Sequence, residues 1–300
     1  MSLPLKLLCL LAGATLGCET ARAGTVSPAP PNASALPSLS SAPVASAPPV
    51  AKTSATVAPP RATPCPPEMA HVGKNCVDRW EAHLVAADGG AHPHTARPER
   101  GVTYTAKSAP DVMPQAYVNR LEAAAACEQA GKRLCTLRQW FAACRARSGQ
   151  VFPYGASYRA GVCNSGKPHL LTKLYGRDSR KWKYMEHFNS PELNSTPGFL
   201  AKTAEYAGCT NEHGTFDMVG NLHEWVSDTV DQELPNKVPL HHEILEKLNV
   251  NLGHAIFMGG FYGNVSEHGD GCSYLTPGHG KNYHDYSTGF RCCRDATSAN

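Results

Sequence analysis

The chain has 300 residues, with 28 Lys and Arg against 25 Asp and Glu, so its formal net charge is only +3. The basic residues form no clustered stripe, which argues against nucleic acid as a partner. No internal repeat is apparent, and no nucleophile-elbow, zinc-protease, phosphate-loop or dinucleotide-binding motif occurs, so the common enzymes built on those motifs are excluded.

The first 18 residues read as a signal peptide of the lipoprotein type. Lys6 precedes an apolar run over residues 7–16 that is too short to span a bilayer. The Leu-Gly-Cys sequence that ends this run resembles a bacterial lipobox, which makes Cys18 the expected lipidation site. The alternative is cleavage after the Ala-Arg-Ala sequence at 21–23, which would leave a soluble product. Because a Cys directly ends the apolar run, we favour a lipid anchor in an envelope membrane; either cleavage exports the chain.

Residues 19–64 are rich in Ala, Pro, Ser and Thr and nearly lack aromatic side chains. Such a segment cannot bury enough apolar surface to offset its ordering entropy, so we expect a disordered linker. Behind a lipidated Cys18, it would hold a folded domain away from the membrane. A plain linker with no required reach remains the alternative.

Residues 65–295 are expected to form one domain, followed by a short tail at 296–300. This part contains ten cysteines and no C-x-x-C pair. In an exported chain, that composition favours disulfides over metal ligands and indicates a loop-rich fold. Cys65 and Cys76 are close in sequence, and we expect them to pair.

Periodicity predicts the first strands and the first helix. Residues 69–72 and 76–80 read as two short strands around Gly73. Residues 116–130 read as a helix with Tyr117 and Leu121 on its apolar stripe, and Gly131 is a natural stop.

A capping-box pattern from Thr136 to Gln139 predicts that a second helix begins there, with Trp140 and Cys144 on its buried face. Further along, residues 229–251 form an insertion that could carry a short amphipathic helix. Strands are expected at 255–262 and, closing the domain, at 289–292.

The stretch 216–228 carries the strongest chemical pattern. Asp217, the carbonyls of Gly220 and Leu222, and Glu224 fall at offsets 0, 3, 5 and 7. Two carboxylates flanking two backbone oxygens can surround a hard cation such as Ca²⁺. The alternative is a Gly-Asn turn next to a buried Trp225, with both acids in solvent.

Three motifs carry a resemblance to a known family. The sequences G-K-R-L at 131–134, D-M-V-G-N-L-H-E-W at 217–225 and G-F-R-C at 289–292 resemble, in this order, landmarks of the formylglycine-generating enzyme, or sulfatase-modifying factor, family. The resemblance spans about residues 65–295. It implies an α+β, C-type-lectin-like fold with short strands, few helices and long loops, and with structural calcium. It also implies that Asn164 helps to bind a second Ca²⁺.

The resemblance further implies two long-range disulfides. The family joins the equivalents of Cys127 and Cys292, and those of Cys144 and Cys272. Each would connect one of the two predicted helices to the C-terminal part of the domain.

The remaining four cysteines are assigned from their neighbourhoods. Cys293 follows Cys292, and Cys135 follows the first helix, so the first implied disulfide brings Cys135 and Cys293 together. An exchange of partners between Cys292 and Cys293 is the alternative. Cys163 would then pair with Cys209, tying together the loops that carry the two calcium sites.

The family's oxidase chemistry does not carry over residue by residue. The resemblance implies copper held by two cysteine thiolates just after a Gly-Gly pair, because soft monovalent copper needs such ligands. Residues 263–269 occupy that window here and contain no cysteine, so copper is not supported. Relatives of the ergothioneine sulfoxide synthase type use three histidines for iron, largely from a separate helical domain for which this chain has no room. Iron is therefore not supported either.

His268, His279 and His284 lie near the corresponding surface and could form a different metal site. Exposed histidine-rich loops without a metal are the alternative.

Two functions follow. The favoured one is a calcium-stabilised binding module at the envelope that recognises a protein or a glycan. The other is a non-haem, metal-dependent oxidoreductase that acts on a peptide or a small metabolite.

Overall fold

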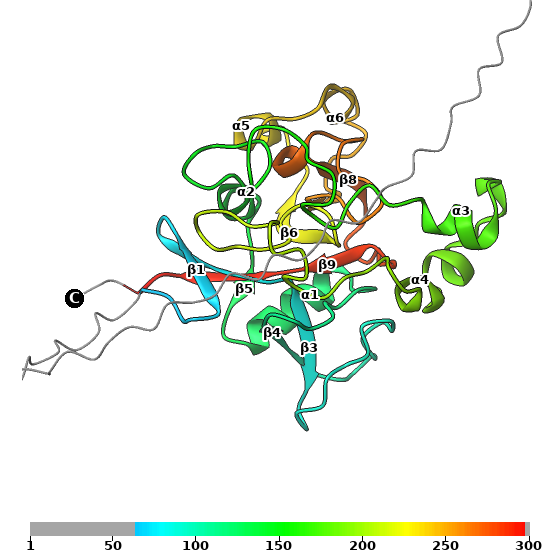
Figure 1. The fold of residues 1–300 in the computed structure, drawn as a ribbon, viewed down its shortest axis with the longest axis horizontal. Coiled ribbons are helices and arrows are strands. Elements are labelled where there is room, and N and C mark those ends of the chain that lie inside the picture. The colour runs from blue at the N-terminus through cyan, green and yellow to red at the C-terminus, as the bar shows by residue number, and fades with distance from the viewer. Residues whose placement is uncertain (1–63, 298–300) are drawn as a thin grey trace, which may run out of the picture. The chain divides into compact units, whose positions relative to one another are not determined.

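The computed structural model describes residues 64–297, which contain short strands in three sheets and several short helices joined by long loops (Figure 1). The predicted signal peptide, the lipidation site Cys18 and nearly all of the linker lie outside these residues. Within 64–297, no helix is long and apolar enough to cross a membrane.

The first sheet joins the two ends of the described domain. Its order is β1-β2-β10-β5, with every neighbouring pair antiparallel. The strands are β1 (Met69–Val72), β2 (Asn75–Asp78), β10 (Cys292–Asp295) and β5 (Arg133–Leu134). The expected strand at 69–72 is confirmed, whereas the expected strand at 76–80 begins and ends earlier.

The second sheet has the order β8-β7-β6-β9, and β6 pairs with β9 in parallel. Its strands are β8 (Leu275–His279), β7 (Ala255–Met258), β6 (His223–Thr229) and β9 (Thr288–Phe290). The strand predicted over 255–262 stops at Met258. Gly259 has φ +86°, and a Cβ there would lie 2.6 Å from the Met218 carbonyl oxygen, so the chain must turn.

The predicted closing strand at 289–292 is in fact two strands in two different sheets. The chain leaves the second sheet after β9 and enters the first sheet at β10. Arg291 is the residue between them, and its side chain is completely buried. The C-terminal segment therefore connects both sheets through one buried arginine.

The third sheet pairs β3 (Ala82–Ala86) with β4 (Tyr104–Ser108), and helix α1 (Arg120–Gln129) packs against β4. The predicted helix at 116–130 begins too early. Tyr117 has φ +57° and donates its backbone N–H to Asp285, so the helix starts only after the Asn119 cap. The predicted stripe is also wrong, because Leu121 is 44% exposed.

Helix α2 (Leu137–Arg145) matches its prediction. Thr136 and Gln139 form the reciprocal capping box, and Leu137, Trp140, Ala143 and Cys144 are buried. The local signal was sufficient here because both capping partners are within one helical turn.

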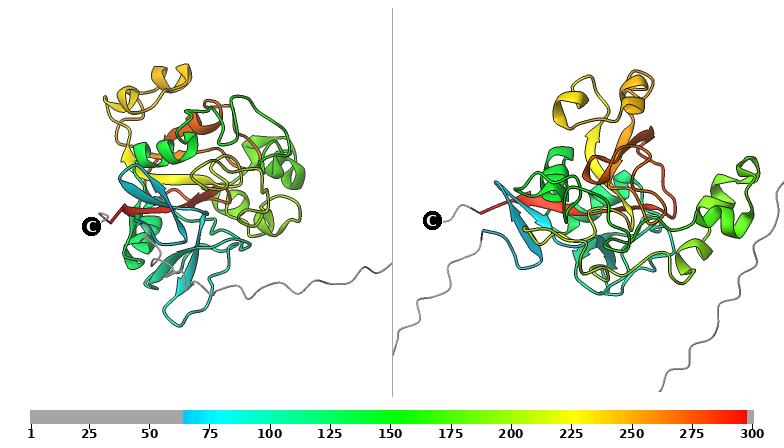
Figure 2. Two further views of the ribbon diagram at one scale, coloured as in Figure 1. Left: turned by 60° about the vertical axis from the view of Figure 1, so that its left-hand side comes forward. Right: turned by 45° about the horizontal axis from the view of Figure 1, so that its top comes forward.

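The other helical segments are short. They are α3 (Leu170–Tyr175), η1 (Ser179–Lys181), η2 (Tyr184–Phe188), α4 (Glu192–Ser195), α5 (Leu234–Lys237), α6 (His242–Glu246) and η3 (Gly271–Ser273). The insertion at 229–251 carries α5 and α6, which stand out from strands β6 and β7 in both views of Figure 2. Ile244 of α6 is buried, as an amphipathic helix requires.

Five disulfides connect these elements, and they join the pairs that we expected. Cys292 and Cys293 are adjacent in β10 and bond Cys127 and Cys135 respectively, so the alternative exchange of partners is not present. Such a framework, with short strands and long loops, confirms the expected α+β, disulfide-rich class. The remaining disulfides join Cys65 to Cys76, Cys144 to Cys272 and Cys163 to Cys209.

Candidate functional site

A buried ion pair lies where the sheets and helix α2 meet. The Arg291 guanidinium donates from Nε to Glu224 Oε2 at 2.6 Å and from Nη2 to Glu224 Oε1 at 2.6 Å. The Trp140 indole N–H also donates to Glu224 Oε2, at 2.7 Å. Both oxygens of Glu224 are therefore held in place. The remaining guanidinium hydrogens reach backbone carbonyls, including that of Phe216 at 2.8 Å.

Asp217 lies beside this pair in the tight loop that precedes β6. Its Oδ2 accepts the backbone N–H of Ala204 at 2.7 Å. No hydrogen bond reaches its Oδ1 from any described residue. Only 3% of Asp217 is exposed, and burial raises its pKa to about 7. The loop is close-packed: Gly220 has φ +84°, and a Cβ there would lie 2.3 Å from the Asn164 carbonyl oxygen.

Glu81 is a third acid in the same place, and no sequence pattern predicted it. It is completely buried, and it accepts the Asn221 side-chain N–H at 2.5 Å and the Leu222 backbone N–H at 3.1 Å. Burial raises its pKa well above the ordinary value, and the nearby Asp217 and Glu224 carboxylates add to the shift. Because Glu81 is 140 residues from Asn221 in sequence, no local spacing connects them.

Asn164 contacts the same loop from the other side. Its side-chain N–H₂ donates to Asn221 Oδ1 at 2.7 Å and to the Phe199 carbonyl at 2.8 Å. Its own Oδ1 is buried and has no hydrogen-bond partner in the described chain. A buried acceptor without a donor is costly, and a cation would compensate it.

The expected calcium ligands can be tested against this geometry. Asp217 and Glu224 are both buried, so the alternative in which they are solvated acids is wrong. Fully ionised, Glu81, Asp217 and Glu224 would carry three negative charges against the single positive charge of Arg291. The surplus negative charge and the oxygen donors fit a hard divalent cation.

The structure alters the expected set of calcium ligands. Glu224 is already bound by Arg291 and Trp140, so it could only share an oxygen with a cation. Within residues 64–297, no group of three or more His, Cys, Asp or Glu side chains could hold a metal ion. A cation at this loop would therefore depend on Asp217 and on the carbonyls of Gly220 and Leu222.

The three candidate histidines do not form one cluster, although His268 and His279 both lie near His223. His284 Nδ1 contacts Asn189 Oδ1 at 2.6 Å. His279 instead stacks on Tyr283, with ring centroids 3.8 Å apart. His268 packs edge-on against Tyr274. Since no metal cluster occurs in the described residues, the structure gives this hypothetical three-histidine site no support.

A different histidine lies deep in the second sheet. His223 of β6 packs against Phe257, Phe261 and Tyr274, with ring centroids 4.5 to 5.5 Å away. Burial lowers its pKa well below the ordinary value, and the neighbouring His279 and His268 add to this shift. His223 is therefore a neutral core side chain that packs among aromatic rings.

A pocket of about 440 Å³ opens at the window after the Gly-Gly pair. It contains no sulfur atom. Two disulfides lie next to its lining residues in the sequence. Cys272, which bonds Cys144, is two residues from Asp270, and Cys163, which bonds Cys209, is three residues from Gly166. The lining residues are Phe152, Tyr158, Gly166, Gly263, Asn264, Val265, Ser266 and Asp270.

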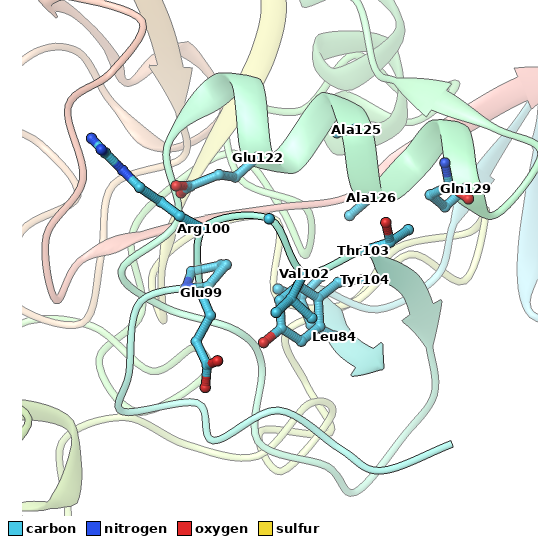
Figure 3. Close-up of a pocket in the computed structure, with 12 residues that line it drawn as sticks. Leu84, Glu99, Arg100, Val102, Thr103, Tyr104, Glu122, Ala125, Ala126 and Gln129 are labelled. Atoms are coloured by element: carbon cyan, nitrogen blue, oxygen red, sulfur yellow. The ribbon is translucent and has the colours of Figure 1, made fainter. Parts of the chain in front are cut away.

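A second hollow, of about 330 Å³, lies between α1 and the segment at 98–104 (Figure 3). Figure 3 shows Leu84, Val102 and Tyr104 grouped on one side of it, with α1 on the other. Glu122, which also lines it, is already paired with Arg97 and with the cap of its own helix. Glu99, Arg100 and Gln129 also line this hollow, so it combines charged and polar side chains with the apolar group.

Comparison with protein families matches residues 69–296 to the family described as Sulfatase-modifying factor enzyme 1-like domain. A search of curated proteins finds no match. Among solved structures, PvdO from Pseudomonas aeruginosa is similar at 14% identity and TM-score 0.41, covering 74% of this chain and 80% of that one. The Major Tropism Determinant P3c variant is similar at 12% identity and TM-score 0.39, covering 79% of this chain and 54% of that one.

Proposed function

The chain belongs to the Sulfatase-modifying factor enzyme 1-like domain family and has its C-type-lectin-like fold, and we propose that it is a calcium-stabilised binding module of that family. The observation that carries the proposal is the oxidation state of the cysteines. All ten cysteines in residues 64–297 are in disulfides. A disulfide offers no thiolate, and copper(I) needs soft thiolate ligands. The pocket at the 263–270 window would therefore lack the thiolates that copper-dependent oxidation requires.

Calcium is the second part of the proposal. Asp217, with the carbonyls of Gly220 and Leu222, would hold one ion, and Glu224 would contribute an oxygen that it shares with Arg291. The unpaired Oδ1 of Asn164 would serve a second ion. The support is the surplus of buried carboxylates over buried cations. Bound calcium would supply positive charge to the loop and link it to strand β6; we assign it no chemical step.

Export is supported by the five disulfides, because disulfides form and persist mainly in oxidising, extracytoplasmic compartments. We propose in addition that Cys18 is lipidated and that the domain is held at an envelope membrane by the Pro-rich linker. The expected partner is another component of the envelope, either a protein or a glycan.

Metal analysis of purified protein tests the proposal against the alternative of a metal-dependent oxidoreductase. We expect calcium bound near stoichiometry, neither copper nor iron, and no thiol titratable by Ellman's reagent in denatured, unreduced domain 64–300. Stoichiometric copper or iron that survives dialysis against a calcium-containing buffer would overturn the binding-module proposal. Two titratable thiols per domain would remove its central observation.

A further inference from the structure

The pocket at the 263–270 window has an aromatic wall. Tyr158 is 45% exposed, and its ring lies 5.9 Å from that of Phe152 at a tilt of 58°. Tyr154 stacks behind Phe152 at 5.5 Å and supports it. Tyr158 therefore presents a large, unpaired ring face to solvent at the pocket. Exposed aromatic faces of this kind pack against ligands that are apolar on one side and polar at the edge.

The opposite wall is polar, and only part of it is available. Asn264 is committed to the loop itself, because its Oδ1 accepts the N–H groups of Ser266 and Glu267 and its Nδ2 donates to Glu267. The Ser266 hydroxyl and the Asp270 carboxylate are exposed, and no hydrogen bond reaches either from residues 64–297. The pocket therefore combines one hydroxyl and one carboxylate with an aromatic face.

Both walls are rigid. Phe261 and Asn264 exchange two backbone hydrogen bonds, at 2.9 and 3.1 Å, which close the hairpin. Gly271 lies against the aromatic wall so closely that a Cβ would come within 2.8 Å of the Phe152 ring. Together with the disulfides at Cys272 and Cys163, these contacts position the walls before any ligand arrives. A preorganised site loses less conformational entropy on binding.

Charge narrows the ligand class. Asp270 is the only charged residue among the eight that line the pocket, and no Lys or Arg is among them. A phosphate or carboxylate ligand would find no counter-charge there. A sugar ring has one face of C–H groups that can lie on Tyr158 and a rim of hydroxyls that can donate to a carboxylate. We propose that this pocket binds a neutral carbohydrate, with Tyr158 as the stacking platform and Asp270 and Ser266 as hydrogen-bonding groups. This inference rests on the proposed binding function and names its ligand class.

Saturation-transfer difference NMR on the full-length, disulfide-intact protein tests it. The probes are the methyl glycosides of glucose, mannose, galactose and N-acetylglucosamine, each at millimolar concentration. We expect transfer to the C–H face of at least one glycoside. Tyr158→Ala should weaken its binding by about tenfold, and Tyr158→Phe should keep it. Asp270→Asn should weaken binding without changing which protons are saturated. Met185→Ala, an exposed apolar residue outside the pocket, is the control and should bind like the wild type.

Three outcomes would overturn the inference. The first is no transfer to any of the four glycosides. The second is transfer that Tyr158→Ala leaves unchanged. The third is binding of tetramethylammonium at this pocket in place of sugars, which would show a cation site built on Asp270. Each is distinct from failure of the proposed function, which is decided by copper or iron in the metal analysis whatever the sugars do.

Discussion

Arg291→Met should be among the most destabilising single substitutions in the domain. The Arg291 guanidinium is completely buried and provides two of the three hydrogen bonds to the Glu224 carboxylate. It also lies near Asp217 and Glu81, whose charges act on it. Methionine would fill similar volume but would leave these buried acids without a cation.

The magnitude follows from the cost of an unpaired buried charge. Removing one partner of a buried ion pair costs about 3 to 5 kcal/mol. In a domain of this size, each kcal/mol corresponds to about 2 to 4 °C in melting temperature. We therefore expect Arg291→Met to lower the melting temperature by about 6 to 20 °C. Arg133→Met is the matched control, since the Arg133 and Asp295 side chains are 40% and 81% exposed and such pairs contribute about 1 kcal/mol or less.

Calorimetry on the oxidised domain, with and without excess calcium, would measure both variants. The double variant Glu224→Gln with Arg291→Met should be less destabilised than Arg291→Met alone, because it buries one fewer unpaired anion. A melting temperature for Arg291→Met within 3 °C of the wild type would refute the reasoning. So would a double variant that melts lower than the single one, because the buried charge would then not be the cause.

Three further predictions concern calcium, the disulfides and the anchor. Chelation with EGTA should lower the melting temperature of the wild type, whereas Asp217→Ala should melt lower and lose that response; the exposed Asp111→Ala should keep it. Replacing Cys144 and Cys272 together by Ser opens a loop of 128 residues and should lower the free energy of unfolding, measured with denaturant, by about 4 to 5 kcal/mol. A loss below about 1 kcal/mol would show that this disulfide does not stabilise the domain as the chain-entropy model expects. Fatty-acid labelling should mark the full-length protein but not Cys18→Ser, and a soluble product starting at Gly24 would disprove the anchor.

Elements whose stabilising contacts are local could be predicted from the sequence. Helix α2 starts where the capping box at Thr136 places it, because its partner is three residues away. Helix α1 does not start where periodicity places it, because Tyr117 is held by Asp285 from the far end of the chain. A single tertiary hydrogen bond and a positive φ thus override a helical pattern of four residues.

The residues of the candidate site also fall into those that local spacing predicts and those that only the tertiary structure reveals. The spacing of Asp217 and Glu224 indicated a shared location, and the structure places both in one buried cluster. Glu81 and Arg291 complete that cluster from distant strands, and no spacing could reveal them. Closeness in sequence can also mislead. His279 and His284 are five residues apart, yet they contact different neighbours.

The three family motifs meet physically, and this explains why they identify a fold better than an activity. Leu134, from the first motif, lies opposite Cys292, from the third, in the first sheet. Glu224, from the second, is bound by Arg291, from the third. These residues pair strands and neutralise buried charge, and both roles are structural whether or not the chain catalyses a reaction. The 263–270 window contains none of these motif residues, and it lines a separate pocket. There Tyr158 and Asp270 line the pocket at which we propose that the chain binds its ligand.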